Sequence, residues 1–162
     1  MTKNILIPTD YSLESLIVLK EVLKEKVSLN SNINYQIHFV TGYYRGDSIR
    51  DLLFNSEERI LEKIKSQEFD EACAILQNKY SELINGISHH LYSGYFQSGF
   101  NHFLEINEID EIYFSNTKLR HSDSNVFDLS RFIKKSNVST SIIETETTTY
   151  PQSRGLLAQF FT

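Results

Sequence analysis

The chain has 162 residues, which fits one domain, and its 40% hydrophobic and 23% charged residues are ordinary for a globular protein. Its net charge of −5 argues against a nucleic-acid partner, because nucleic-acid backbones require a basic face. Since the chain contains no long apolar run, no signal-peptide pattern and only one cysteine, we expect a cytoplasmic protein without membrane spans or disulfides.

The predicted elements alternate between strand and helix along the chain. Residues 5–7 form a short continuous apolar run closed by Pro8, which is typical of a strand buried on both faces of a parallel sheet. Ser12 is a suitable N-cap for a helix that runs to Lys26. The remaining predicted elements are a strand at 35–40, a helical region at 56–84 that forms one helix or two with a break near Gln67, a strand at 87–92, a helix capped by Ser98, a strand at 109–114, a helix that contains Phe127 and Ile133, and a strand at 138–143.

This order, β-α-β-α-β-α-β-α-β, predicts an α/β fold with an open, doubly wound parallel sheet of five strands and helices on both faces. Gly42 is predicted to begin a loop after the second strand, and Gly86 is predicted to cap the helical region before the third strand. We expect one α/β domain over residues 1–144, followed by a C-terminal tail over 145–162 that is extended at first and apolar at its end.

The first residues carry a family resemblance. The run KNILIPTDYS at 3–12 resembles the opening of the universal stress proteins, which begin with a strand ending in Pro-Thr/Val-Asp and a serine-capped helix. Gly94 after the third strand and the run SNVSTSII at 136–143 are also similar to that family. The resemblance covers residues 3–144 and implies the family's Rossmann-like (HUP-type) fold.

The resemblance also implies where a nucleotide would bind. In the ATP-binding branch of the family, adenosine contacts the end of strand one and the end of strand two. In this sequence the matching residues are Pro8, Thr9, Asp10 and Val40.

The family's phosphates lie on a G-x2-G-x9-G-S/T segment after strand four. Its first two glycines fall on Ser115 and Lys118, and the third falls on Val126 or Asp128, so none of these positions is glycine. Because glycine lets backbone N–H groups approach an anion closely, we expect no tight ATP binding; ATP is disfavoured, and no other cofactor is expected.

Two alternatives stay open at this site. Asp10 either contacts a ribose or base, or helps to cap the first helix. The second hypothesis is a nucleotide- or anion-binding protein with slow hydrolysis, which uses the cleft beside Asp10 and the 115–125 loop. Lys118, Arg120 and His121 supply charge there, near a helix start at Ser124. The sequence contains no recognisable set of nucleophile, base and oxyanion site, so we do not expect an enzyme.

The histidines and the cysteine give no metal or thiol site. His89 and His90 are adjacent on a predicted strand and point to opposite faces, so they cannot bind one ion together. Cys73 lies on the apolar stripe of the helical region, where a core role is expected. The third strand ends without the aspartate of a phospho-receiver domain, and no G-x-G-x-x-G motif follows the first strand.

The end of the chain suggests how the protein associates. The family often pairs its final strand with that of a second subunit, and residues Val138 to Ile143 are β-branched and free of charge and proline, so we expect a homodimer through this edge. In the tail, residues 156–161 contain four large apolar side chains. We expect them to dock on their own domain or across the dimer, the alternative being a free terminus. The first hypothesis is therefore a homodimeric, stress-related interaction module with an unknown protein partner, and a third hypothesis is that the tail captures that partner.

Overall fold

The computed structural model describes residues 1–144 except positions 30, 47, 55, 117–120 and 122. Two expectations therefore lie outside the described residues. One is the role of Lys118 in the binding site, and the other is the docking of the apolar end of the segment 145–162. Within the described residues each predicted strand has a counterpart, in the predicted order along the chain.

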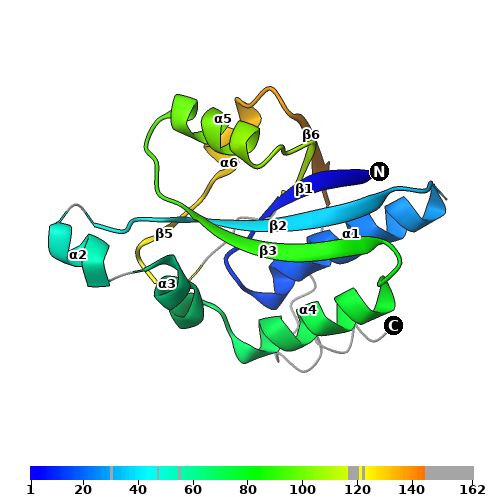
Figure 1. The fold of residues 1–162 in the computed structure, drawn as a ribbon, viewed down its shortest axis with the longest axis horizontal. Coiled ribbons are helices and arrows are strands. Elements are labelled where there is room, and N and C mark those ends of the chain that lie inside the picture. The colour runs from blue at the N-terminus through cyan, green and yellow to red at the C-terminus, as the bar shows by residue number, and fades with distance from the viewer. Residues whose placement is uncertain (30, 47, 55, 117–120, 122, 145–162) are drawn as a thin grey trace.

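Five parallel strands form one open sheet, as the sequence predicts. In chain order they are β1 (Thr2–Pro8), β2 (Asn34–Tyr43), β3 (Ile84–Tyr92), β4 (Glu111–Ser115) and β6 (Ser139–Ile143). Across the sheet the order is β3-β2-β1-β4-β6, so the winding direction reverses at β1 (Figure 1). A short sixth strand that was not predicted, β5 (Val126–Phe127), pairs antiparallel with β2. In such sheets ligands bind at the carboxyl ends of the strands beside the reversal, which here is the end of β1.

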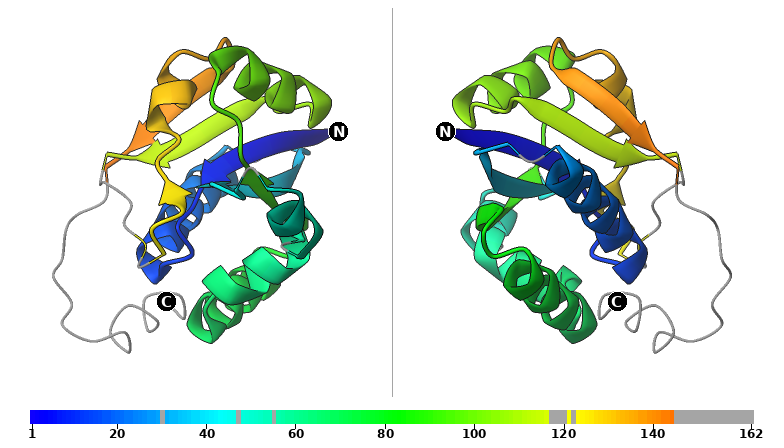
Figure 2. Two further views of the ribbon diagram at one scale, coloured as in Figure 1. Left: turned by 90° about the vertical axis from the view of Figure 1, so that its left-hand side faces the viewer. Right: turned by 90° about the vertical axis from the view of Figure 1, so that its right-hand side faces the viewer.

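Helices cover both faces of the sheet (Figure 2). On one face lie α1 (Leu13–Ser28), α3 (Glu57–Ile64) and α4 (Gln67–Lys79), and on the other lie α5 (Gln97–Ile106) and α6 (Ser130–Lys134). The short helix α2 (Ile49–Phe54) projects beyond the carboxyl end of β2 (Figure 1). Among the described residues, none of the helices combines the length and the apolar character that a membrane crossing requires.

Strand β1 is buried on both sides, as its continuous apolar run predicts. Ile5 and Ile7 pack in the core beneath α1 and α4, whereas Leu6 belongs to the core beneath α5 and α6. All three side chains are fully buried. Because alternate side chains of a strand point to opposite faces, only an unbroken apolar run can serve two cores at once.

The helical region predicted over 56–84 divides into two helices and the start of a strand. The break falls at Ser66, near the expected position, and its side chain caps α4 by accepting a hydrogen bond from the Phe69 amide at 3.1 Å. The prediction that Gly86 caps a helix is wrong, because Gly86 lies inside β3 opposite Gln36. The apolar residues at the start of β3 fit a helical stripe as well as a strand, so periodicity could not separate the two.

Three further predictions about boundaries are wrong. Gly42 lies within β2 and does not begin a loop. Ser98 does not cap α5, which begins one residue earlier without a side-chain cap. Phe127 lies in β5 and not in a helix, because Asp128 accepts a hydrogen bond of 2.8 Å from the Ser130 amide and starts α6 only there. Asx turns of this kind offer the backbone a local alternative to an earlier helix start.

Candidate functional site

The carboxyl end of β1 joins three of the residues that the resemblance assigns to a nucleotide. Pro8 stands level with Val40 of β2 in the sheet register, and the Thr9 amide donates a hydrogen bond of 2.9 Å to the Val40 carbonyl. The Thr41 hydroxyl donates to the Thr9 carbonyl at 2.8 Å. The structure thus places Pro8, Thr9 and Val40 at one corner of the sheet and fixes them through the backbone of β2.

The side chain of Thr9 is held within a chain of hydrogen bonds from its own segment. Its oxygen accepts from the Tyr11 amide at 2.9 Å and lies 2.6 Å from the hydroxyl oxygen of Ser15. Because the Ser15 hydroxyl donates to the Ser12 carbonyl at 2.7 Å, the Thr9 hydroxyl is the donor to Ser15. Both the donor and an acceptor site of this hydroxyl are therefore engaged, and Thr9 is buried.

Asp10 lies at the same corner with its carboxylate turned to the start of α1. One oxygen, Oδ1, accepts hydrogen bonds from the Ser12 amide at 3.0 Å and from the Ser12 hydroxyl at 2.5 Å. Ser12 occupies the N-cap position of α1 but makes no side-chain cap bond to that helix. Asp10 is 3% exposed, so the geometry favours the structural alternative, in which this carboxylate orders the turn into α1.

Tyr11 is a part of this corner that the sequence analysis missed. Its φ angle of 62° lies in the left-handed region, which a non-glycine residue adopts at some cost. The turn directs the buried ring into the core, where it meets the edge of Phe69 and its hydroxyl lies 3.3 Å from Nδ1 of His89. Burial raises the pKa of Tyr11 and lowers the pKa of His89 to about 4, so both side chains are neutral near pH 7.

Ser115 lies at the same edge of the sheet, at the end of β4. The register that pairs Leu6 with Ile112 places Thr9 level with Ser115 when it is continued by three residues. Ser115 itself is level with Ile143 of β6 and is partly exposed. The predicted phosphate position is thus at the expected edge.

Between β4 and β5 the chain passes from one side of β1 to the other, because β1 lies between β4 and β2 in the sheet. It joins β2 through β5, in which Phe127 stands level with Gly42, and the Tyr44 amide donates to the Asn125 carbonyl at 2.9 Å. Gly42 is required for this approach, since a Cβ there would lie 2.6 Å from the carbonyl oxygen and from the ring of Phe127. Sequence periodicity cannot detect such a contact.

Beside this crossing lies a hollow of about 450 Å³ that His121 and Asp123 line together with Lys63 of α3. The His121 Nδ1 accepts from the Asp123 amide at 2.9 Å, so the ring carries its proton on Nε2, which lies 3.2 Å from the Ile64 carbonyl. The Asp123 carboxylate lies 3.5 Å from Lys63 Nζ and accepts from the Tyr43 hydroxyl at 3.1 Å. A hydrogen bond from the Asn125 backbone is the main cause that lowers the pKa of Asp123, so its charge balances that of Lys63.

The remaining candidate groups lie in the two cores. His89 stacks on Phe39 on one face, while His90 Nε2 lies 3.0 Å from His38 Nδ1 on the other, as expected for neighbours on a strand. Cys73 belongs to the core beneath α4, as predicted, and burial raises the pKa of its thiol to about 12. In the part of the chain that the structure describes, no three His, Cys, Asp or Glu side chains are grouped closely enough to hold a metal ion.

Comparison with known proteins now connects this architecture to a fold family. No protein-family model and no curated protein sequence matches the chain. Among solved structures, the universal stress protein UspA from Lactobacillus plantarum is similar with a TM-score of 0.55 and 14% identity over 87% of this chain and 97% of that one. A universal stress protein in complex with cAMP is similar with a TM-score of 0.51 and 13% identity over 89% of this chain and 98% of that one. The chain therefore has the fold of the universal stress proteins.

Proposed function

We propose that the protein is a cytoplasmic universal stress protein of the branch that does not bind ATP, and that it acts as a homodimer through contacts with other proteins. The observation that carries this proposal is the closed corner at the end of β1. Thr9 and Asp10 are buried there and bonded to Ser12, Ser15 and Val40 of the same chain. A ribose that contacts the Thr9 or Asp10 side chain would have to displace its bond to Ser15 or Ser12, and each buried polar group left unpaired costs about 1–3 kcal/mol.

The segment after β4 supports the same proposal. A phosphate loop needs several backbone N–H groups that point at the ligand, and glycine makes that arrangement accessible. Here Val126 stands at one of the matched glycine positions, and its amide donates to the Asp123 carbonyl at 3.2 Å. Its neighbour Phe127 packs against Gly42. At this matched position the backbone N–H therefore bonds within the chain and does not point at a ligand.

The homodimer is proposed from strand β6. Within the described residues β6 pairs with β4 alone, so its other side is an open edge of the sheet. Its residues Thr140, Ser141 and Ile142 are exposed, and the strand contains neither a charge nor a proline that would block pairing. Open edges of this kind associate unless something protects them, and antiparallel pairing with a second β6 would continue the sheet.

A second candidate function is the binding of a nucleotide or another anion. Two observations favour it: a solved structure of the same fold is described in complex with cAMP, and Lys63 lines the hollow beside the crossing segment. Asp123 in the same hollow opposes it, because its negative charge neutralises Lys63 and repels an anion.

Thermal unfolding with and without millimolar Mg-ATP, and separately with cAMP, tests the proposal. A ligand at about 100 times its dissociation constant would stabilise the fold by about 2.7 kcal/mol, which corresponds to several degrees. We expect a change of less than about one degree. A rise of several degrees that Asp10→Asn abolishes would instead support a nucleotide at β1, whereas a rise that Lys63→Met abolishes would support an anion in the hollow.

A further inference from the structure

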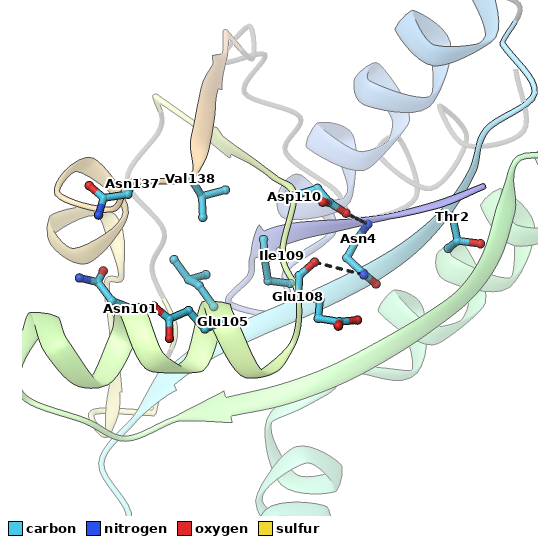
Figure 3. Close-up of a pocket in the computed structure, with 10 residues that line it drawn as sticks. Thr2, Asn4, Asn101, Glu105, Glu108, Ile109, Asp110, Asn137 and Val138 are labelled. Atoms are coloured by element: carbon cyan, nitrogen blue, oxygen red, sulfur yellow. Dashed lines mark hydrogen bonds between the residues drawn. The ribbon is translucent and has the colours of Figure 1, made fainter.

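The opposite end of the sheet carries a second hollow, of about 480 Å³, that none of the predicted sites uses. Its walls come from α5, from the turn before β4 and from the segment before β6 (Figure 3). Leu104, Ile109 and Val138 supply apolar lining, and Asn101 and Asn137 flank it. The size suits a few side chains of a docked segment, since pockets that bind small molecules measure about 300–1,000 Å³.

Three carboxylates line the hollow: Glu105, Glu108 and Asp110. The Asp110 carboxylate accepts a hydrogen bond of 2.8 Å from the backbone N–H of Asn4 and so helps to hold β1 in place (Figure 3). Glu105 and Glu108 are exposed and form no ion pair with any described residue. The hollow therefore presents uncompensated negative charge above an apolar floor, which fits a basic residue followed by apolar ones.

The position of β6 relates this hollow to the end of a second subunit. Val138 and Asn137, which line the hollow, directly precede β6. In an antiparallel pair centred on Ser141, the partner's strand runs the opposite way, and position 145 of the partner falls level with Asn137. The partner's C-terminal segment would thus leave its strand at the rim of this hollow.

The C-terminal segment, residues 145–162, contains side chains that complement the charge and the apolar lining of the hollow. Residues 145–162 contain one basic residue, Arg154, which is followed by Leu156 and Leu157. The stretch from 145 to 154 can span up to about 33 Å when extended, which is ample for a start at the rim. We propose that the hollow holds the C-terminal segment of the second subunit, with Arg154 on the carboxylates and the two leucines against Val138. This proposal rests on the proposed homodimer.

Cysteine cross-linking of the full chain tests it. The native Cys73 is buried and does not compete. We would mix a chain carrying Asn101→Cys, in the wall of the hollow, with a chain carrying Ala158→Cys, allow subunit exchange, and oxidise mildly. A covalent dimer is expected, at a yield at least about fivefold above that with Asn78→Cys. Asn78 is more exposed than Asn101 and lies on α4, on the other face of the sheet, so greater access alone would favour the control.

Charge exchange provides the second readout. Glu105→Lys and Arg154→Glu should each lower the cross-link yield severalfold, and the two changes together should restore it. A further chain carries both cysteines. If the cross-link forms only within that chain and not between the two singly substituted chains, docking across the dimer is overturned. A dimeric native mass without the cross-link would overturn the docking and leave the homodimer intact, whereas a monomeric native mass would refute the homodimer itself.

Discussion

Nζ of Lys26 lies 2.9 Å from Oε2 of Glu111, so an ion pair joins the last turn of α1 to the first residue of β4. The Tyr113 hydroxyl donates to the same carboxylate oxygen at 2.8 Å, and the ammonium group lies 5.3 Å from the ring centres of Tyr35 and Tyr113. The two charged side chains are only 8% and 18% exposed. This polar cluster therefore links α1 to the sheet near the amino end of β4.

Replacing Lys26 by methionine should lower the free energy of unfolding by about 2 kcal/mol, because the largely buried carboxylate of Glu111 would lose the nearer of its two cationic partners. The effect stays below that of a fully buried pair, since Lys3 lies 3.6 Å from the same carboxylate. Lys24→Met is the matched control, because the Lys24–Glu21 pair on the same helix is exposed and should contribute less than about 0.5 kcal/mol. Urea denaturation of both variants measures the difference, and equal effects would contradict the prediction.

Stability should fall as the pH drops from about 6.5 to 4, because burial and the neighbouring His90 lower the pKa of His38 to about 4. Between these pH values His38 is protonated in the unfolded chain but neutral in the folded chain, so lowering the pH favours unfolding. Because solvent screens this group, we expect His38 to lower the free energy of unfolding by about 2 kcal/mol over this pH range. Around His38, Nδ1 faces His90 and Nε2 faces Asn4, and Glu57 is the acidic group that acts on His90.

The measurement is urea denaturation at pH 7.5, 6, 5 and 4. In His38→Gln the free energy of unfolding should decrease less between pH 7.5 and 4 than in the native chain, because the contribution of His38 is removed. The control His102→Gln changes an exposed residue of α5 and should give the same pH profile as the native chain. A native and a His38→Gln profile that run parallel would show that this imidazole is not protected in the folded protein.

Much of the fold could be predicted because it depends on local patterns. The apolar run of Ile5 to Ile7 and the serine at position 66 act through strand alternation and helix capping, which a sequence displays directly. The short elements could not be predicted in this way. β5 exists because Gly42, 85 residues before Phe127, leaves room for its ring and carbonyl, and such a match between distant positions has no period.

The candidate site, too, could be predicted only where it depends on local sequence patterns. Asp10 could be placed at the end of β1 from the order of the elements alone. Its burial could not, because the sequence shows neither the bonds of Ser12 to its carboxylate nor the left-handed backbone of Tyr11 beside it. Thr41 was missed although it follows Val40 directly, since only the register of β2 shows that its hydroxyl reaches the Thr9 carbonyl.

Gly42→Ala should destabilise the protein by about 1–3 kcal/mol, because the new methyl group meets the Phe127 backbone at 2.6 Å and β5 must move away. Gly86→Ala is the matched control: its new methyl group meets the end of the flexible Gln36 side chain at 2.7 Å, so a rotamer change relieves the contact. We expect the control to change the free energy of unfolding by less than about 0.5 kcal/mol. If both alanines have the same effect, the close approach of β5 to β2 is not a constraint.

The last prediction concerns the open edge of β6. Successive N–H groups of a strand point to opposite sides, so of Thr140 and Ser141 one faces β4 and the other faces the open edge. Proline removes the donor. We therefore expect one of Thr140→Pro and Ser141→Pro to lower the melting temperature by several degrees, and the other to keep the fold and lose the dimer.

Ile142→Lys tests the same edge without a change in the backbone. Ile142 is 56% exposed, and in a strand pair centred on Ser141 a lysine there would lie diagonally from the lysine introduced in the partner strand, so the dissociation constant should rise at least about tenfold. Val27→Lys, at a similarly exposed position of 54% on α1, is the control and should leave the mass unchanged. Light scattering at tens of micromolar of chain measures all four variants. Dimers that survive both prolines and the lysine would place the interface elsewhere on the molecule.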